Sequence, residues 1–146
     1  RGICVLIPGI PGASDNITVR SIVGRFLEHS RIFWFRNGGR EELYISSADW
    51  MPRNLNDRVE LMVPIEDPEI KRRLKQMVDI ELSDNQKAHI MQADGTWLKT
   101  ISAENQLCAQ EYFQKIAEKR DAEDEMTLAQ KLEPYTPVLG HGDGSD

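Results

Sequence analysis

Several common functional signatures are missing from this 146-residue sequence. No run of 18 or more apolar residues occurs, which excludes a transmembrane helix. The two cysteines, Cys4 and Cys108, lie far apart within apolar patterns. We interpret them as buried thiols of a reducing compartment rather than as a disulfide framework, and we expect a cytoplasmic protein. The three histidines, His29, His89 and His141, lack the paired spacing of a transition-metal site, so we expect no metal ligands among them.

The glycine-rich phosphate-binding motifs are also absent. The sequence contains neither Gly-x-x-x-x-Gly-Lys-Ser/Thr nor Gly-x-Gly-x-x-Gly. Without the first motif, the chain has no ordinary phosphate-binding loop of the kind that many kinases use. Without the second, it has no dinucleotide-binding motif. A phosphate site in this chain must therefore be built from other residues.

Lysine is missing from residues 1–58, which contain eight arginines and six acidic residues. Arginine grips phosphate oxygens with a planar fork of donors, whereas lysine offers a hydrated point charge. The excess of arginine indicates that this half of the chain binds an anion through hydrogen bonds of defined geometry. The alternative is that the excess is a chance feature of the composition. The net charge of −6 comes from residues 121–146, which hold seven acids and one lysine.

Apolar runs and turn residues predict a mixed α/β domain with a central sheet flanked by helices. Asn37-Gly38-Gly39 and Asp94-Gly95 favour hairpin turns. Asp67 followed by Pro68 predicts the start of one helix, and Ser102 is expected to cap a second. The expected strands are 2–7, 17–24 (or a short helix), 32–35, 43–47, 59–64 and the two arms of 88–101.

The domain organisation predicted from composition is one domain over residues 1–120, followed by an acidic tail rich in proline and glycine over 121–146. The chain opens without methionine directly onto an apolar run. We therefore expect it to be a piece of a longer polypeptide.

Candidate functional residues gather in the stretch 21–60. His29-Ser30-Arg31 precedes one strand, and Ser46-Ser47-Ala48-Asp49 follows the next. This order of histidine, basic residue, strand, turn and polar loop resembles the half-site of the phospholipase D superfamily. Arg31, Arg36 and Asp49 depart from that family's pattern, which disfavours simple phosphodiester hydrolysis. For Ser47 and Asp49, loop capping is the alternative to phosphate contact.

A second resemblance accounts for these departures. The runs Ser-Ile-Val-Gly-Arg-Phe-Leu-Glu-His-Ser-Arg (21–31), Tyr-Ile-Ser-Ser-Ala-Asp-Trp-Met-Pro-Arg-Asn (44–54) and Asp-Arg-Val-Glu (57–60) are similar to the C-terminal, second phospholipase D-like domain of bacterial polyphosphate kinase. The Arg-Gly-Ile-Cys run at residues 1–4 fits as well, and the resemblance is dense over residues 1–90.

The resemblance implies a phospholipase D-like half and an ATP:polyphosphate phosphotransferase. That family moves the terminal phosphate of ATP reversibly onto inorganic polyphosphate through a phosphohistidine in the preceding domain, with Mg²⁺ bound mainly outside this segment. His29 would be the partner histidine of the second half-site. The expected nucleotide- and phosphate-binding residues are Arg1, Arg58, Arg31, Ser47 and Asp49.

The same resemblance implies the partners: ATP or ADP, polyphosphate and the remaining kinase domains, with homo-oligomers, peripheral membrane association and no nucleic acid. The segment alone is expected to be inactive. Two alternatives remain at this stage, a non-catalytic module that binds polyanions or nucleotides and a phosphodiesterase half-site.

Overall fold

The computed structural model describes residues 6–131, and the side chains of residues 6–121. The chain divides into two units, Arg1–Tyr112 and Phe113–Asp146. The first unit holds all six described strands, and the described part of the second is the continuation of helix α3 (Ala109–Lys131). Residues 121–131 of the predicted tail are therefore helical. The predicted phosphate ligand Arg1 and most of the predicted strand 2–7 lie outside the described residues.

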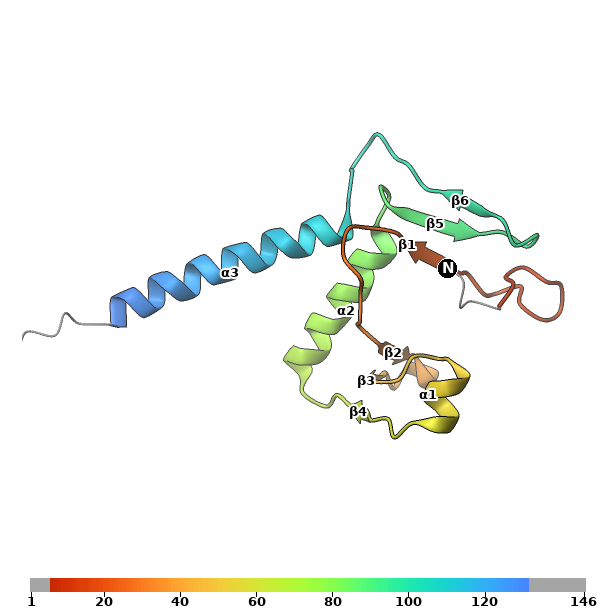
Figure 1. Cartoon of the computed structure of the whole chain (residues 1–146), viewed down its shortest axis with the longest axis horizontal. Helices are drawn as coiled ribbons and strands as arrows, with labels where there is room; N and C mark the ends of the chain where they lie inside the picture. The colour runs from red at the N-terminus through yellow and green to blue at the C-terminus, as the bar shows by residue number, and fades with distance from the viewer. Residues whose placement is uncertain (1–5, 132–146) are drawn as a thin grey trace, which may run out of the picture. The chain divides into compact units, whose positions relative to one another are not determined.

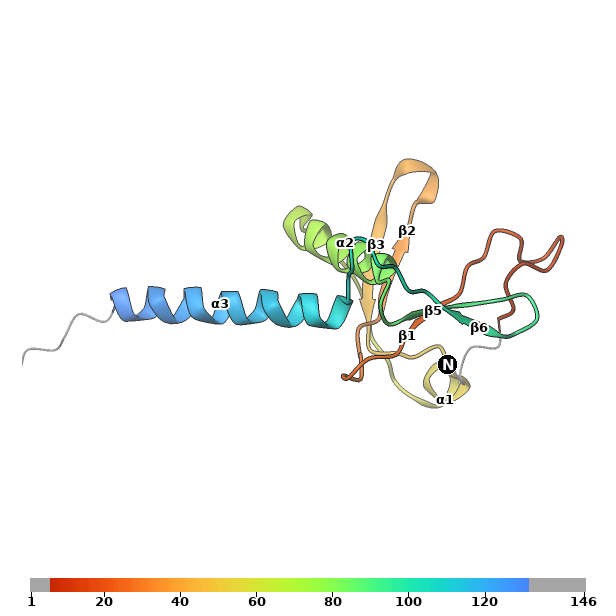
Figure 2. The same ribbon diagram turned by 90° about the horizontal axis from the view of Figure 1, so that it is seen from above.

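Two antiparallel three-stranded sheets form in the first unit, in place of the single central mixed sheet expected from the sequence. One sheet has the order β1 (Arg20–Ile22), β5 (Ala88–Met91), β6 (Trp97–Lys99). The other has the order β2 (Ile32–Phe35), β3 (Glu42–Ser46), β4 (Met62–Pro64), and Figures 1 and 2 both show β2 beside β3. Each sheet is built on a tight hairpin, and antiparallel pairing needs no long crossover connection. The mixed α/β class is confirmed, but the six strands form two separate sheets rather than one.

Local turn chemistry explains both hairpins. The 3₁₀ turn η1 (Asn37–Gly39) joins β2 to β3, and all three of its residues have positive φ, between 41° and 99°. Gly95, at the β5–β6 turn, has a φ of 82°. Glycine adopts these angles without steric cost, which is why the sequence predicted both turns correctly. The predicted strand pairs are confirmed.

The second helix of the fold, α2 (Pro68–Ser83), starts as the sequence predicts. The side chain of Asp67 accepts hydrogen bonds from the backbone N–H groups of Glu69 and Ile70, both at 2.9 Å. Leu74, Met77 and Val78 of its apolar stripe are half-buried. A shorter helix, α1 (Pro52–Asp57), follows the β3 loop and also begins with proline.

The start of α3 differs from the prediction. Ser102 does not cap it, because its hydroxyl bonds locally to the backbone of Glu104 and the helix begins only at Ala109. The carboxylate of Asp84 caps α3 instead, accepting from the backbone N–H of Ala109 at 2.8 Å. The predicted strand at residues 2–7 also differs where it is described, since Leu6 and Ile7 are outside any strand and both are exposed.

Asp84 is fully buried and is the largest side chain in that condition among the described residues. Its Oδ1 atom accepts from the backbone N–H groups of Gln86, Lys87 and Ala88 at 2.7–3.0 Å. Its backbone carbonyl accepts from the guanidinium of Arg20 in β1. One carboxylate thus joins the end of α2, the start of β5 and the start of α3.

The surroundings of this carboxylate also set its charge. Burial alone would raise the pKa of Asp84, but the four backbone N–H groups outweigh burial and hold the pKa below the ordinary value of 3.8. Because the folded pKa is lowered, the stabilisation is present in full above about pH 4 and is lost as the pH falls through the folded pKa.

We predict that Asp84→Ala lowers the free energy of unfolding by about 3 kcal/mol or more, because buried N–H groups are left without an acceptor. Asp94→Ala is the matched control, since Asp94 is exposed and caps only the local turn at Thr96. Urea unfolding at pH 7 measures both variants. Equal losses in the two would contradict the structural role of Asp84.

Candidate functional site

The β2–β3 hairpin brings the two candidate segments of the sequence to one place. Ile32, at the start of β2, pairs with Ile45 near the end of β3. The backbone N–H of Ser46 also donates to the carbonyl of Arg31 at 3.0 Å. Because the strands are antiparallel, the residues before β2 and those after β3 lie at the same end of the hairpin. His29 and Arg31 are therefore placed next to the loop that carries Ser47 and Asp49.

Arg31 and Asp49 form the central ion pair of this site. The Nε atom of Arg31 donates to Oδ1 of Asp49 at 2.8 Å, and its Nη2 atom lies 2.8 Å from the same oxygen. Its Nη1 atom donates to the backbone carbonyl of His29 at 2.7 Å. The hydrogen bond from Arg31 is the largest cause that lowers the pKa of Asp49, and the charges of Arg53 and His29 add to it. Arg31 thus links the chain before β2 to the loop after β3.

Glu60 is the second anionic centre of the site. It accepts from the hydroxyl of Ser47, and its Oε1 atom accepts from the side-chain amide of Asn54 at 2.9 Å. These two hydrogen bonds, followed by the charges of Arg58 and Arg31, hold the pKa of Glu60 below its usual value of 4.5. Ser47 itself accepts from the backbone N–H of Leu61 at 3.0 Å. Glu60 is therefore ionised at neutral pH and fixed by hydrogen bonds to the β3 loop and α1.

Asn54 was not identified from the sequence. It is 5% exposed although it lies in a short polar helix, α1, and its Oδ1 atom has no hydrogen-bond partner among the described residues. A sequence such as Pro-Arg-Asn-Leu-Asn-Asp gives no sign of which polar residue is buried. Only the packing of α1 against Glu60 reveals the role of Asn54 as a hydrogen-bond donor to that carboxylate.

Of the predicted site residues, Arg31, Ser47 and Asp49 make hydrogen bonds around the carboxylates of Asp49 and Glu60. His29 is exposed, and its charge acts on Asp49, while Arg58 is exposed at the end of α1, and its charge acts on Glu60. Within residues 6–121, neither side chain makes a hydrogen bond or ion pair. Beside the hydrogen bonds, the charges of Arg31 and Arg53 help to lower the pKa of Asp49, and those of Arg58 and Arg31 help to lower the pKa of Glu60. The site presents a free imidazole and free guanidinium groups, which suits the binding of an anion.

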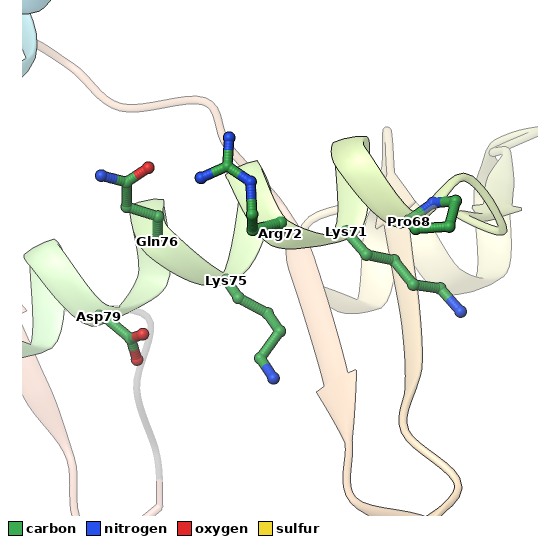
Figure 3. A pocket seen from close by; sticks show the side chains of 6 residues that line it. All are labelled: Pro68, Lys71, Arg72, Lys75, Gln76 and Asp79. Carbon is green, nitrogen blue, oxygen red and sulfur yellow. The ribbon is translucent and has the colours of Figure 1, made fainter.

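A shallow hollow of about 530 Å³ lies along α2 rather than at this site, lined by Pro68, Lys71, Arg72, Lys75, Gln76 and Asp79 (Figure 3). Two of its cations are already paired. Arg72 bonds to Glu69 at 2.5 Å, and Lys75 bonds to Glu41 at 2.8 Å while lying 4.5 Å from the ring centre of Trp34. Lys71 is the one cation of the hollow without an ion pair within the described residues, and we assign the hollow no function.

Within the described residues, no group of three or more histidine, cysteine, aspartate or glutamate side chains is placed to hold a metal ion. Asp49 and Glu60 are also occupied by Arg31, Ser47 and Asn54. None of the described helices is both long and apolar enough to cross a membrane.

Comparison with known proteins identifies the domain. The fold is shared with part of a solved structure: the crystal structure of polyphosphate kinase from Porphyromonas gingivalis superposes with a TM-score of 0.75 at 39% identity, covering 84% of this chain and 19% of that one. The family model for polyphosphate kinase C-terminal domain 2 matches residues 1–110, and the chain belongs to this family.

Curated relatives agree with the assignment. A polyphosphate kinase from Pseudomonas aeruginosa is 55% identical over 106 residues, which are 73% of this chain and 15% of the relative. One from Synechocystis is 52% identical over 122 residues, 81% of this chain and 17% of the relative. The chain thus spans less than a fifth of the length of these proteins. The predicted resemblance and fold class are confirmed.

We predict that Arg31→Met raises the pKa of Asp49 toward 3.8, because Arg31 is the largest cause of its lowering. Arg53→Met is the matched control and should raise it less, since Arg53 acts only through its charge. Carbon-13 NMR titration of the Asp49 carboxyl group measures both. A larger rise in the control variant would contradict the ion pair as the organising contact of the site.

Proposed function

We propose that this chain is the C-terminal part of a cytoplasmic polyphosphate kinase that transfers the terminal phosphate of ATP reversibly to polyphosphate. In this proposal a histidine in the preceding domain carries the phosphate, and His29 is the partner histidine in the second half-site. The observation that carries it is the guanidinium group of Arg31, which bonds to the backbone of His29 and to Asp49 and so joins the two predicted segments at one end of the β2–β3 hairpin. Membership of the family supports the same reaction.

The chemistry of phosphoryl transfer fits these groups. The transferred group spreads negative charge over its oxygens, so catalysis depends mainly on positioning and on cationic stabilisation. His29 would donate a proton to, or bind, a phosphate oxygen as charge develops on it. Arg58 would bind phosphate oxygens directly, because no carboxylate among the described residues is bonded to it.

In this proposal the other residues of the site position the loops around the phosphate or bind the phosphate themselves. Arg31 is held by Asp49 and would offer its remaining Nη–H donors to phosphate while it fixes the backbone at His29. Ser47 and Glu60 would fix the loop after β3. Arg1, matched by the family resemblance, would bind phosphate as well, although it lies outside the described residues.

Mg²⁺ is the ion that the family implies, and within the described residues no group of three or more histidine, cysteine, aspartate or glutamate side chains is placed to hold it. The two carboxylates of the site are occupied by Arg31, Ser47 and Asn54. We therefore propose that Mg²⁺ is bound by nucleotide phosphates and by residues outside this chain. The partners would be ATP or ADP, polyphosphate and the remaining kinase domains in a homo-oligomer.

In a full-length kinase carrying this domain, His29→Ala should reduce polyphosphate synthesis by about 100-fold or more, the usual contribution of a positioned proton donor. ATP binding should be retained, because the arginines are unchanged. His89→Ala is the matched control, since His89 lies in β5 of the other sheet and should be dispensable. Synthesis from ATP and binding of labelled ATP measure the two effects separately.

Two outcomes would contradict the proposal. Undiminished synthesis by His29→Ala would favour a module that binds polyanions through charge alone. Polyphosphate synthesis by the 146-residue chain on its own would show that the phosphate-accepting histidine is not in another domain.

A further inference from the structure

The segment that carries His29 has no regular secondary structure of its own. Residues 23–31 connect β1 to β2 without helix or strand. The segment is tied at its start, where the backbone N–H of Val23 donates to the carbonyl of Lys87 at 3.3 Å, and at its end, where the carbonyl of Arg31 accepts from Ser46 at 3.0 Å. The position of an irregular segment depends on contacts with other elements, because no ladder of backbone hydrogen bonds fixes it.

Gln110, in the first turn of α3, supplies such contacts in the middle of the segment. Its Oε1 atom accepts from the backbone N–H of Phe26 at 3.0 Å, and its Nε2 atom donates to the carbonyl of Phe26 at 2.8 Å. The same Nε2 atom donates to Oε1 of Glu28 at 2.9 Å. The side chain of Gln110 therefore bonds to both the backbone N–H and the carbonyl of Phe26, and to the side chain of Glu28, the residue just before His29. Gln110 is itself buried, at 7% exposure.

Gly24 shows how closely Gln110 approaches the segment. A Cβ atom added at Gly24 would lie 2.2 Å from Oε1 and 2.6 Å from Cδ of Gln110. Those distances are far below van der Waals contact, so any larger residue at position 24 must displace the glutamine. Gly24 does not adopt a positive φ, so space alone accounts for glycine here.

We propose that Gln110 is a positioning residue for His29, holding the Phe26–Glu28 backbone so that the imidazole stays at the end of the β2–β3 hairpin. The proposal rests on the proposed function, in which His29 acts on phosphate. The effect is indirect, through three hydrogen bonds to residues one to three positions before His29. Displacement of a reacting group by about 1 Å can reduce the rate by about 100-fold even when substrate binding is unchanged.

The first test compares Gln110→Leu with Gln114→Leu in a full-length kinase carrying this domain. Gln114 lies on the same helix but is exposed, and within residues 6–121 its side chain bonds only to Glu118. Gln110→Leu should lower kcat for polyphosphate synthesis by about 10- to 100-fold with the KM for ATP changed by no more than about twofold, because positioning rather than binding is lost. Hydrogen exchange of the peptide covering residues 24–28 should accelerate. Gln114→Leu should change neither quantity.

The second test uses Gly24 and does not depend on the folding of Gln110→Leu. Gly24→Ala should lower kcat by itself, because its methyl group displaces the glutamine. In a Gln110→Ala background the same substitution should cost nothing further, since the colliding side chain is gone. An additive loss in the double variant would overturn the proposed contact.

His29→Ala, measured alongside, separates the two proposals. Loss of synthesis in His29→Ala together with wild-type kcat in Gln110→Leu overturns the positioning role and leaves the proposed function standing. Wild-type synthesis in His29→Ala overturns both. If Gln110 acts through His29, the double variant His29→Ala/Gln110→Leu should be no slower than His29→Ala alone.

Discussion

The buried carboxylate of Asp84 connects the end of α2 to the start of β5 and to the start of α3. The carboxylate accepts from backbone N–H groups leading into β5 and from the first N–H of α3, and the backbone carbonyl of Asp84 accepts from Arg20 of β1. A buried charge is tolerated only when its hydrogen bonds are made, and here four backbone donors make them. The start of α3 is thereby fixed in the first unit, which in turn places Gln110 beside the segment that carries His29.

The site itself depends on the antiparallel register of β2 and β3. That pairing brings residues 29–31, before β2, next to residues 46–49, after β3. The ion pair between Arg31 and Asp49 links the two stretches. The carboxylates of the site are bonded to protein groups, while the side chains of His29 and Arg58 make no hydrogen bond within residues 6–121. A phosphate-binding surface requires donors that are not already bonded to the protein, because such donors remain available to the ligand. His29 and Arg58 meet this requirement within the described residues.

Features that depend on neighbouring residues were predicted well from the sequence. Contacts between residues far apart in the sequence were missed. The hairpin turns and the Asp67 cap each depend on a few neighbouring residues, so they could be predicted and are confirmed. Ser102 failed as a cap because the real one, Asp84, lies 25 residues before Ala109. Asn54 and Gln110 were missed for the same reason, since burial of a polar side chain against a distant partner leaves no local pattern. The residues gathered around Asp49 were found through the family resemblance and the hairpin together.

The most direct measurement is a crystal structure of a full-length kinase carrying this domain, with a non-hydrolysable ATP analogue bound. We expect a phosphate oxygen within hydrogen-bonding distance, about 3 Å, of a ring nitrogen of His29 and of the Arg58 guanidinium. Phosphates bound elsewhere, for example along the α2 hollow, with His29 and Arg58 facing solvent, would contradict the assignment of the β2–β3 site.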